Sequence, residues 1–176
     1  NEMGASLQYT SIAAYFDGET LPEMARFFYR QADEERDHAM RFVRFLLDVD
    51  ATVRIPDIPA PKADFSSAEE AVQLSLEWEK TVTQQIYDLV EIASADSDLI
   101  AVRFLDWFVN EQLEEVSTMS DLLNLVRRAG ESGLLHVEEY LARFPEQEPI
   151  VRIAVRDAAT APGGNSQPPA ALDTRF

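Results

Sequence analysis

The sequence predicts an all-α protein: a four-helix bundle with a long crossover between its second and third helices, a short fifth helix and a C-terminal tail. Six Gly and nine Pro residues lie almost entirely between or beyond long stretches that contain neither, as expected if those stretches are helices. Within the stretches, apolar residues recur at the three- and four-residue spacing of a helix face. We expect the bundle and fifth helix to occupy residues 1–143 and the tail to occupy residues 144–176.

The first two helices form one predicted hairpin. The first runs from Glu2 to Phe16 and ends at the turn signal Asp17-Gly18. The second begins at Thr20-Leu21-Pro22-Glu23, which has the pattern of a capping box with proline in the first turn, and is expected to reach about Val49. Their predicted inward faces hold Glu2, Ala5, Tyr9, Ile12 and Phe16, and then Met24, Phe28, Gln31, Glu35, His38, Phe42 and Phe45.

Residues 50–65 contain three prolines and little helical spacing, which indicates an extended connection along the length of a bundle. Phe65 followed by Ser66-Ser67-Ala68-Glu69 predicts a hydrophobic staple and capping box that open the third helix. The fourth helix is expected over about Leu99 to Arg128, and the short fifth over Leu134 to Arg143. The predicted inward faces of the third and fourth helices hold Val72, Leu76, Glu79, Val82 and Ile86, and then Leu105, Phe108, Gln112, Glu115, Met119, Leu122 and Val126.

Composition narrows the chemistry that this bundle can perform. Asp and Glu total 32 against 15 Lys and Arg, a net charge of -17, and so acidic a chain repels nucleic acid. It has no Cys and two His, which excludes disulfides, thiolate metal sites and His-rich cages. Carboxylate sites for hard cations remain. No membrane span and no N-terminal signal are recognisable, so we expect a cytoplasmic protein.

Every predicted bundle helix places a carboxylate on its inward face. Ionised carboxylates in a bundle core are unfavourable unless they are paired or bind metal. Glu35 and His38 form a Glu-x-x-His motif, whose i, i+3 spacing puts both side chains on one helix face. Together with Glu2 and Glu79 from two other helices, this motif is typical of a dinuclear carboxylate metal site in a four-helix bundle.

Less specific interpretations exist for several of these residues. His38 taken alone could be a hydrogen-bonded core histidine, and His136 has no carboxylate partner at ligand spacing, so we interpret it as structural or exposed. Glu111, Glu114 and Glu115 could form a solvated helix face. Tyr9 lies seven residues after Glu2 on the same face, where it could pack in the core or act as a redox-active neighbour of a metal.

Four blocks of the sequence resemble the non-haem bacterial ferritins over roughly residues 1–143. The blocks are Asn1-Glu2 with Tyr9, Glu34-Glu35-Arg36-Asp37-His38, Trp78-Glu79, and Phe104-Leu105-Asp106-Trp107-Phe108-Val109-Asn110-Glu111-Gln112-Leu113-Glu114-Glu115. The resemblance implies a ferritin-like fold with a ferroxidase centre. Glu2, Glu35 and His38 would bind one iron, and Glu35 would bridge to a second iron held by Glu79 and aided by Gln112.

The same resemblance implies further features. Glu34, Glu111, Glu114 and Glu115 match a third iron site, and Tyr9 matches a tyrosine beside the centre. Haem-containing bacterioferritins carry a methionine after the bridging Glu, where this chain has Arg36, so no haem is expected. The family has several helical turns before the residue that matches Glu2, so we interpret the chain as an N-terminally shortened form. The implied function is Fe(II) oxidation by O2 or peroxide and mineral storage inside a 24-subunit shell.

Other functions compatible with the bundle are a di-iron oxygenase or peroxidase, a DNA-coating mini-ferritin, and a non-enzymatic scaffold whose carboxylates pair with Arg. The lack of a second Glu-x-x-His argues against the oxygenase, and the complete ligand set within one chain argues against the mini-ferritin. Two hypotheses concern the tail. Its alternating segment 150–155 could dock on a neighbouring subunit, or its terminal residues 171–176 could be recognised by another assembly. The composition of the tail is equally compatible with a flexible segment that has neither role.

Overall fold

The computed structural model describes residues 1–144, which form five α-helices and one short 3-10 turn. The elements are α1 (Glu2–Gly18), α2 (Pro22–Asp48), α3 (Ala68–Ala95), α4 (Leu99–Ala129), η1 (Glu131–Gly133) and α5 (Leu134–Arg143). The all-α fold and the helix order predicted from the sequence are confirmed. Apart from Phe144, the predicted tail and both hypotheses about it lie outside the described residues.

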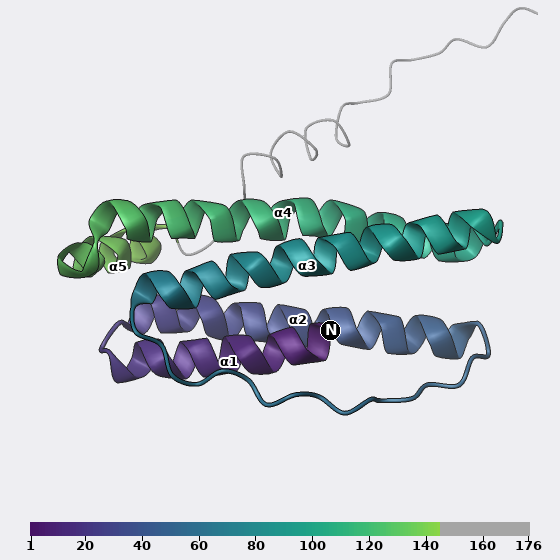
Figure 1. The fold of residues 1–176 in the computed structure, drawn as a ribbon, viewed down its shortest axis with the longest axis horizontal. Helices are drawn as coiled ribbons and strands as arrows, with labels where there is room; N and C mark the ends of the chain where they lie inside the picture. The colour runs from purple at the N-terminus through teal and green to yellow at the C-terminus, as the bar shows by residue number, and fades with distance from the viewer. Residues whose placement is uncertain (145–176) are drawn as a thin grey trace, which may run out of the picture.

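The four long helices form two hairpins that pack against each other. α1 packs mainly on α2, and α3 packs mainly on α4. The connection between α2 and α3 runs back along the bundle, as predicted, so α3 starts at the end where α1 and α2 are joined (Figure 1). α5 lies at this same end, and α1 begins about midway along the bundle (Figure 1).

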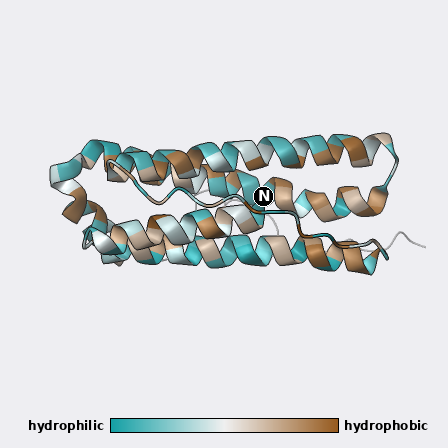
Figure 2. Ribbon diagram, turned by 60° about the horizontal axis from the view of Figure 1, so that its bottom comes forward, coloured by the Kyte–Doolittle hydropathy of each residue, from teal (hydrophilic) through white to brown (hydrophobic). Residues whose placement is uncertain are grey.

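Burial follows the helical spacing of the sequence. The predicted inward positions are buried in all four long helices, except that Phe42 and Phe45 are half-buried. Hydrophilic and hydrophobic segments alternate along the helices in the hydropathy view (Figure 2). Each helix therefore buries one face against the others, which supplies most of the stability of a bundle in water.

The buried apolar residues form two clusters at different levels of the bundle. The larger one surrounds Tyr9, Phe28 and Met119 at the end that carries α5. The smaller one contains Val82 and Phe108 and lies toward the α3–α4 turn. On α2, α3 and α4, the inward residues between the two clusters are polar. The apolar clusters thus hold a buried polar layer from both sides.

The predicted capping box at the start of α2 is wrong. Thr20 has a left-handed backbone with φ of 64°, Leu21 is the N-cap residue, and no side chain from the turn caps the helix. Instead, the carboxylate of Glu138 on α5 accepts hydrogen bonds of 2.8 Å from the backbone N–H groups of Glu23 and Met24. A cap contributed by a distant helix leaves no local pattern in the sequence.

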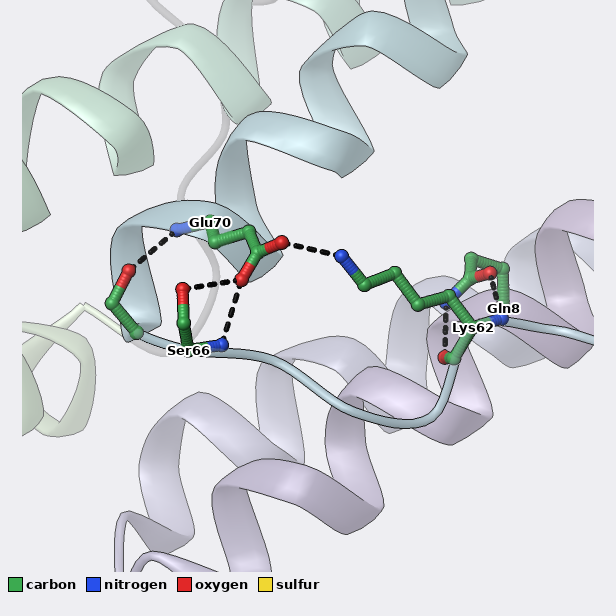
Figure 3. Close-up of polar contacts among 5 residues, drawn as sticks. Gln8, Lys62, Ser66 and Glu70 are labelled. Carbon is green, nitrogen blue, oxygen red and sulfur yellow. Dashed lines mark hydrogen bonds and ion pairs between the residues drawn. The ribbon is translucent and has the colours of Figure 1, made fainter.

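The start of α3 is shifted by one residue from the prediction. Ser67 is the N-cap, and its hydroxyl accepts a 3.1 Å hydrogen bond from the N–H of Glu70. The Glu70 carboxylate in turn accepts from the N–H and the hydroxyl of Ser66 and pairs with Lys62 (Figure 3). These contacts lower the pKa of Glu70 to about 2, with the Lys62 contact the largest cause.

The long connection is tied to α1 at Lys62. The side-chain amide of Gln8 donates to the Lys62 carbonyl at 2.9 Å and accepts from the Lys62 N–H at 2.8 Å (Figure 3). Ser11 donates to the same carbonyl. Because Gln8 is buried, these bonds fix the connection on α1. Within the described part of the chain, no helix is both long and apolar enough to cross a membrane.

We expect Glu138→Ala to lower the free energy of unfolding by about 2 kcal/mol, because it leaves two backbone donors at the start of α2 without their acceptor. Thermal or urea unfolding followed by circular dichroism would measure this loss. Glu139→Ala is the matched control, since Glu139 is the exposed neighbour on the same helix. Equal stability of the two variants would contradict the tertiary cap.

Candidate metal centre

Six polar side chains make up the buried polar layer of the bundle. All four long helices contribute, and the residues are Glu2, Glu35, His38, Glu79, Gln112 and Glu115. Glu35, Glu79 and Gln112 are each only 1% exposed. Four carboxyl groups and one imidazole therefore lie in the interior without direct access to bulk water.

Several of these groups have atoms that no hydrogen bond satisfies. Within residues 1–144, both carboxyl oxygens of Glu35, Oε2 of Glu2, Oε2 of Glu79 and Nδ1 of His38 are buried without a hydrogen-bond partner. Buried polar atoms are normally paired, and unpaired ones are strongly unfavourable. Carboxylate oxygens and an imidazole nitrogen are also the ligands that divalent iron accepts. The donor set fits metal ions.

Burial changes the protonation of the carboxyl groups. It is the main reason that the pKa of Glu35 lies well above its ordinary value, and the nearby charges of Glu79 and Glu2 raise it further. Burial also raises the pKa of Glu2, although the neighbouring Glu35 opposes part of this rise. Burial also raises the pKa of Glu79 to about 7. The metal-free layer therefore holds protons where a metal-loaded one would hold cations.

Glu79 has polar neighbours from two other helices. The hydroxyl of Tyr9 on α1 donates a hydrogen bond to its Oε1. A hydrogen bond from the Gln112 side chain also holds down its pKa, although less than the Tyr9 bond does. Burial and the charge of Glu79 raise the pKa of Tyr9 well above its usual value. Tyr9 therefore keeps its proton near neutral pH and acts as a donor to the site.

His38 lies between two sets of carboxylates. Its Nδ1 is 3.5 Å from Oε2 of Glu35, and its Nε2 is 3.8 Å from Oε1 of Glu111 on α4. Burial, together with the nearby Arg41, lowers the pKa of His38 to about 4. The imidazole is therefore neutral near pH 7, which is the state that binds metal.

Aromatic side chains hold the His38 ring in place. Trp107 and Phe108 meet it edge-to-face, with ring centroids 5.3 and 6.0 Å away. The guanidinium of Arg41 covers the Trp107 ring at 3.9 Å. This stack closes the layer on the side of the smaller apolar cluster. Arg41 could not be predicted from the sequence, because it is one of several arginines on α2 and no local pattern distinguishes it.

One group of ligand atoms already has the spacing of a single cation site. Among the described residues, atoms of His38, Glu111 and Glu115 lie within 4.8 Å of one another. This group does not include two residues predicted for a third iron site. Glu34 is exposed and accepts a hydrogen bond from Gln31, and Glu114 is half-buried. The structure thus brings Glu111 and Glu115 to His38, although the resemblance implies that His38 binds a different iron.

The structure places the other predicted residues as follows. Glu2, Glu35, Glu79 and Gln112 share the polar layer, and Tyr9 borders it. Thr83 is a neighbour of the layer that was not predicted from the sequence. Its hydroxyl donates a 2.9 Å hydrogen bond to Oε1 of Gln112. Its position four residues after Glu79, on the same face of α3, was the available signal.

Comparison with known proteins gives concordant results. A family model described as a ferritin-like domain matches residues 1–129. "Ferritin BfrB" of Mycolicibacterium smegmatis is 45% identical over 143 residues, which cover 81% of this chain and 78% of that protein. A "bacterial non-heme ferritin" of Staphylococcus aureus is 37% identical over 84% of this chain and 91% of its own.

Solved structures agree with the sequence relatives. The crystal structure of an open-pore ferritin from the archaeon Archaeoglobus fulgidus superposes with a TM-score of 0.77. That protein is 31% identical to this chain, and the match covers 80% of this chain and 88% of that one.

The raised pKa of Glu79 predicts a pH dependence of stability. The folded protein keeps this proton up to about pH 7, whereas the unfolded chain releases it near 4.5, so stability falls as pH rises between these values. Glu79→Gln removes this loss. We expect the free energy of unfolding of the metal-free variant, relative to metal-free wild type, to be roughly 2 kcal/mol higher at pH 7.5 than at pH 4.5.

Thermal unfolding of metal-free protein at both pH values would measure the difference. Glu77→Gln, at an exposed site on the same helix, should shift stability equally at the two values. A pH-independent effect of Glu79→Gln would show that Glu79 is not protonated in the folded protein.

Proposed function

We propose that this chain, which belongs to the ferritin family, is an iron-storage protein that oxidises Fe(II) at the buried polar layer. The observation that carries the proposal is the set of buried carboxyl oxygens and the imidazole nitrogen without hydrogen-bond partners. A purely structural role does not explain these unpaired groups, because a scaffold protein would be more stable if the carboxylates were paired or replaced by apolar residues.

We infer that Glu35 joins two iron ions. Its Oε2 lies 3.5 Å from Nδ1 of His38, and the charges of Glu79 and Glu2 act on its carboxyl group. One Fe(II) would be held by Glu2, Glu35 and His38, and a second by Glu35, Glu79 and Gln112. Binding releases the protons of Glu35 and Glu79 and replaces them with positive charge, which removes the penalty of burying several carboxylates together.

Iron is the substrate of this reaction and leaves after oxidation. Each Fe(II) gives up one electron, so a pair supplies the two electrons that reduce O2 to hydrogen peroxide or hydrogen peroxide to water. An oxygen-rich ligand set favours the ferric product. Tyr9, held by its hydrogen bond to Glu79, lies next to the reacting ions as a hydrogen-bond donor and a redox-active neighbour. No haem takes part in the proposed reaction.

A third iron site would use Glu34, Glu111, Glu114 and Glu115. The spacing of His38, Glu111 and Glu115 supports a cation position on this side of the layer. His38 faces both positions, with Nδ1 toward Glu35 and Nε2 toward Glu111. We propose that this third position accepts iron passing between the paired site and the storage space.

We expect Glu35→Ala to slow aerobic Fe(II) oxidation by about tenfold or more, since the side chain shared by both ions is lost. Stopped-flow absorbance of the ferric product would measure the rate. Glu91→Ala is the matched control, because Glu91 is exposed on α3 and away from the layer. Equal rates for wild type and Glu35→Ala would refute the site assignment.

The proposed storage function requires a hollow assembly. We expect the purified chain to sediment as a particle close to 24 times its 19.8 kDa mass, and to retain ferric mineral after loading. Analytical ultracentrifugation before and after aerobic iron loading would test both points. A monomer or dimer that oxidises iron without retaining it would favour a di-iron oxidase over a storage protein.

A further inference from the structure

Thr83 lies one helical turn after Glu79 and joins two parts of the metal centre. Its Oγ1 is 2.8 Å from the backbone carbonyl oxygen of Glu79 and 2.9 Å from Oε1 of Gln112 on α4. A hydroxyl has one proton and two lone pairs, so it cannot donate fully to both oxygens at once. The hydroxyl must therefore favour one partner at a time.

The amide of Gln112 has two chemically different ends. Its oxygen can bind a metal ion, whereas its nitrogen can only donate hydrogen bonds. In the metal-free protein, the oxygen lies toward the Thr83 hydroxyl, so the nitrogen is the end that can donate to the Glu79 carboxylate. The oxygen then accepts the proton of Thr83, in agreement with the 2.9 Å contact.

A cation held by Glu79 would favour the opposite orientation of the Gln112 amide. The oxygen of Gln112 would then have to face the cation, and the nitrogen would face Thr83. Thr83 can satisfy this second orientation as well. Its proton turns to the Glu79 carbonyl, a common bond for threonine within a helix, and its free lone pair accepts from the amide nitrogen.

We propose that Thr83 is a positioning residue that lets the Gln112 amide present its oxygen to the second metal ion and its nitrogen to Glu79 when that ion is absent. The inference rests on the proposed function, since it takes Glu79 and Gln112 as groups that serve a metal ion. Thr83 itself touches no metal and acts through Gln112.

The chain offers a matched control for a merely structural role. Thr81, two residues earlier on α3, makes the same bond to the carbonyl four residues before it, at 2.8 Å from the oxygen of Glu77. It is exposed, and a two-residue step places it on nearly the opposite side of the helix. Thr81→Val therefore removes the helical bond alone, whereas Thr83→Val also removes the contact to Gln112.

Titration of the full, assembled protein with Co(II) tests the inference without any oxidation step. The visible absorption of bound Co(II) reports both affinity and coordination. We expect Thr83→Val to weaken the second Co(II) by roughly tenfold and to change its band shape, as other residues that orient metal ligands do. Thr83→Ser, which keeps the hydroxyl, should restore both, and Thr81→Val should match wild type.

A Gln112→Ala background separates positioning from folding. If Thr83 acts through Gln112, Thr83→Val should change Co(II) binding no further in that background; a further loss would overturn the inference. It would also be overturned if Thr83→Val bound two ions like wild type, or if Thr83→Ser failed to restore binding. A wild-type protein that binds no Co(II) in the polar layer would instead overturn the proposed function, and this inference with it.

Discussion

The burial of several carboxyl groups at one level of the bundle is the constraint on which the rest of the structure depends. Glu35 and Glu79 are almost fully enclosed, and burying ionised carboxylates together is unfavourable without positive charge. The apolar clusters above and below the layer keep water out, so protons or cations must neutralise it. Stability and the proposed metal binding therefore depend on the same arrangement.

Burial shifts the pKa values of the carboxyl groups and of the imidazole in this layer in opposite directions. Burial raises the pKa of Glu79 to about 7 and lowers that of His38 to about 4. Both shifts favour the uncharged form. At neutral pH the imidazole carries no extra proton, whereas burial favours a proton on Glu35, with which an incoming cation would compete. Burial thus reduces the negative charge of this layer, although the chain as a whole is strongly acidic.

Sequence reasoning predicted those features that depend on periodicity. The spacing of Met24, Phe28 and Glu35 on α2 was enough to predict which side faces inward, and burial confirms it. The same spacing brought Glu2 and Glu79 into one layer, although metal binding by these residues stays a prediction. Contacts between residues far apart in the sequence could not be predicted from its periodicity. Nothing near Thr20 shows that Glu138 caps α2, and Thr83 became informative only when Gln112 was found beside it.

The cap from Glu138 also affects the order in which the chain can reach its final form. α1 and α2 are made first and can pair by local contacts, but the first turn of α2 has its acceptors only on α5. More than a hundred residues separate the donors from the acceptor. The hairpin that carries Glu2, Glu35 and His38 therefore gains these two hydrogen bonds only when the last described helix has docked.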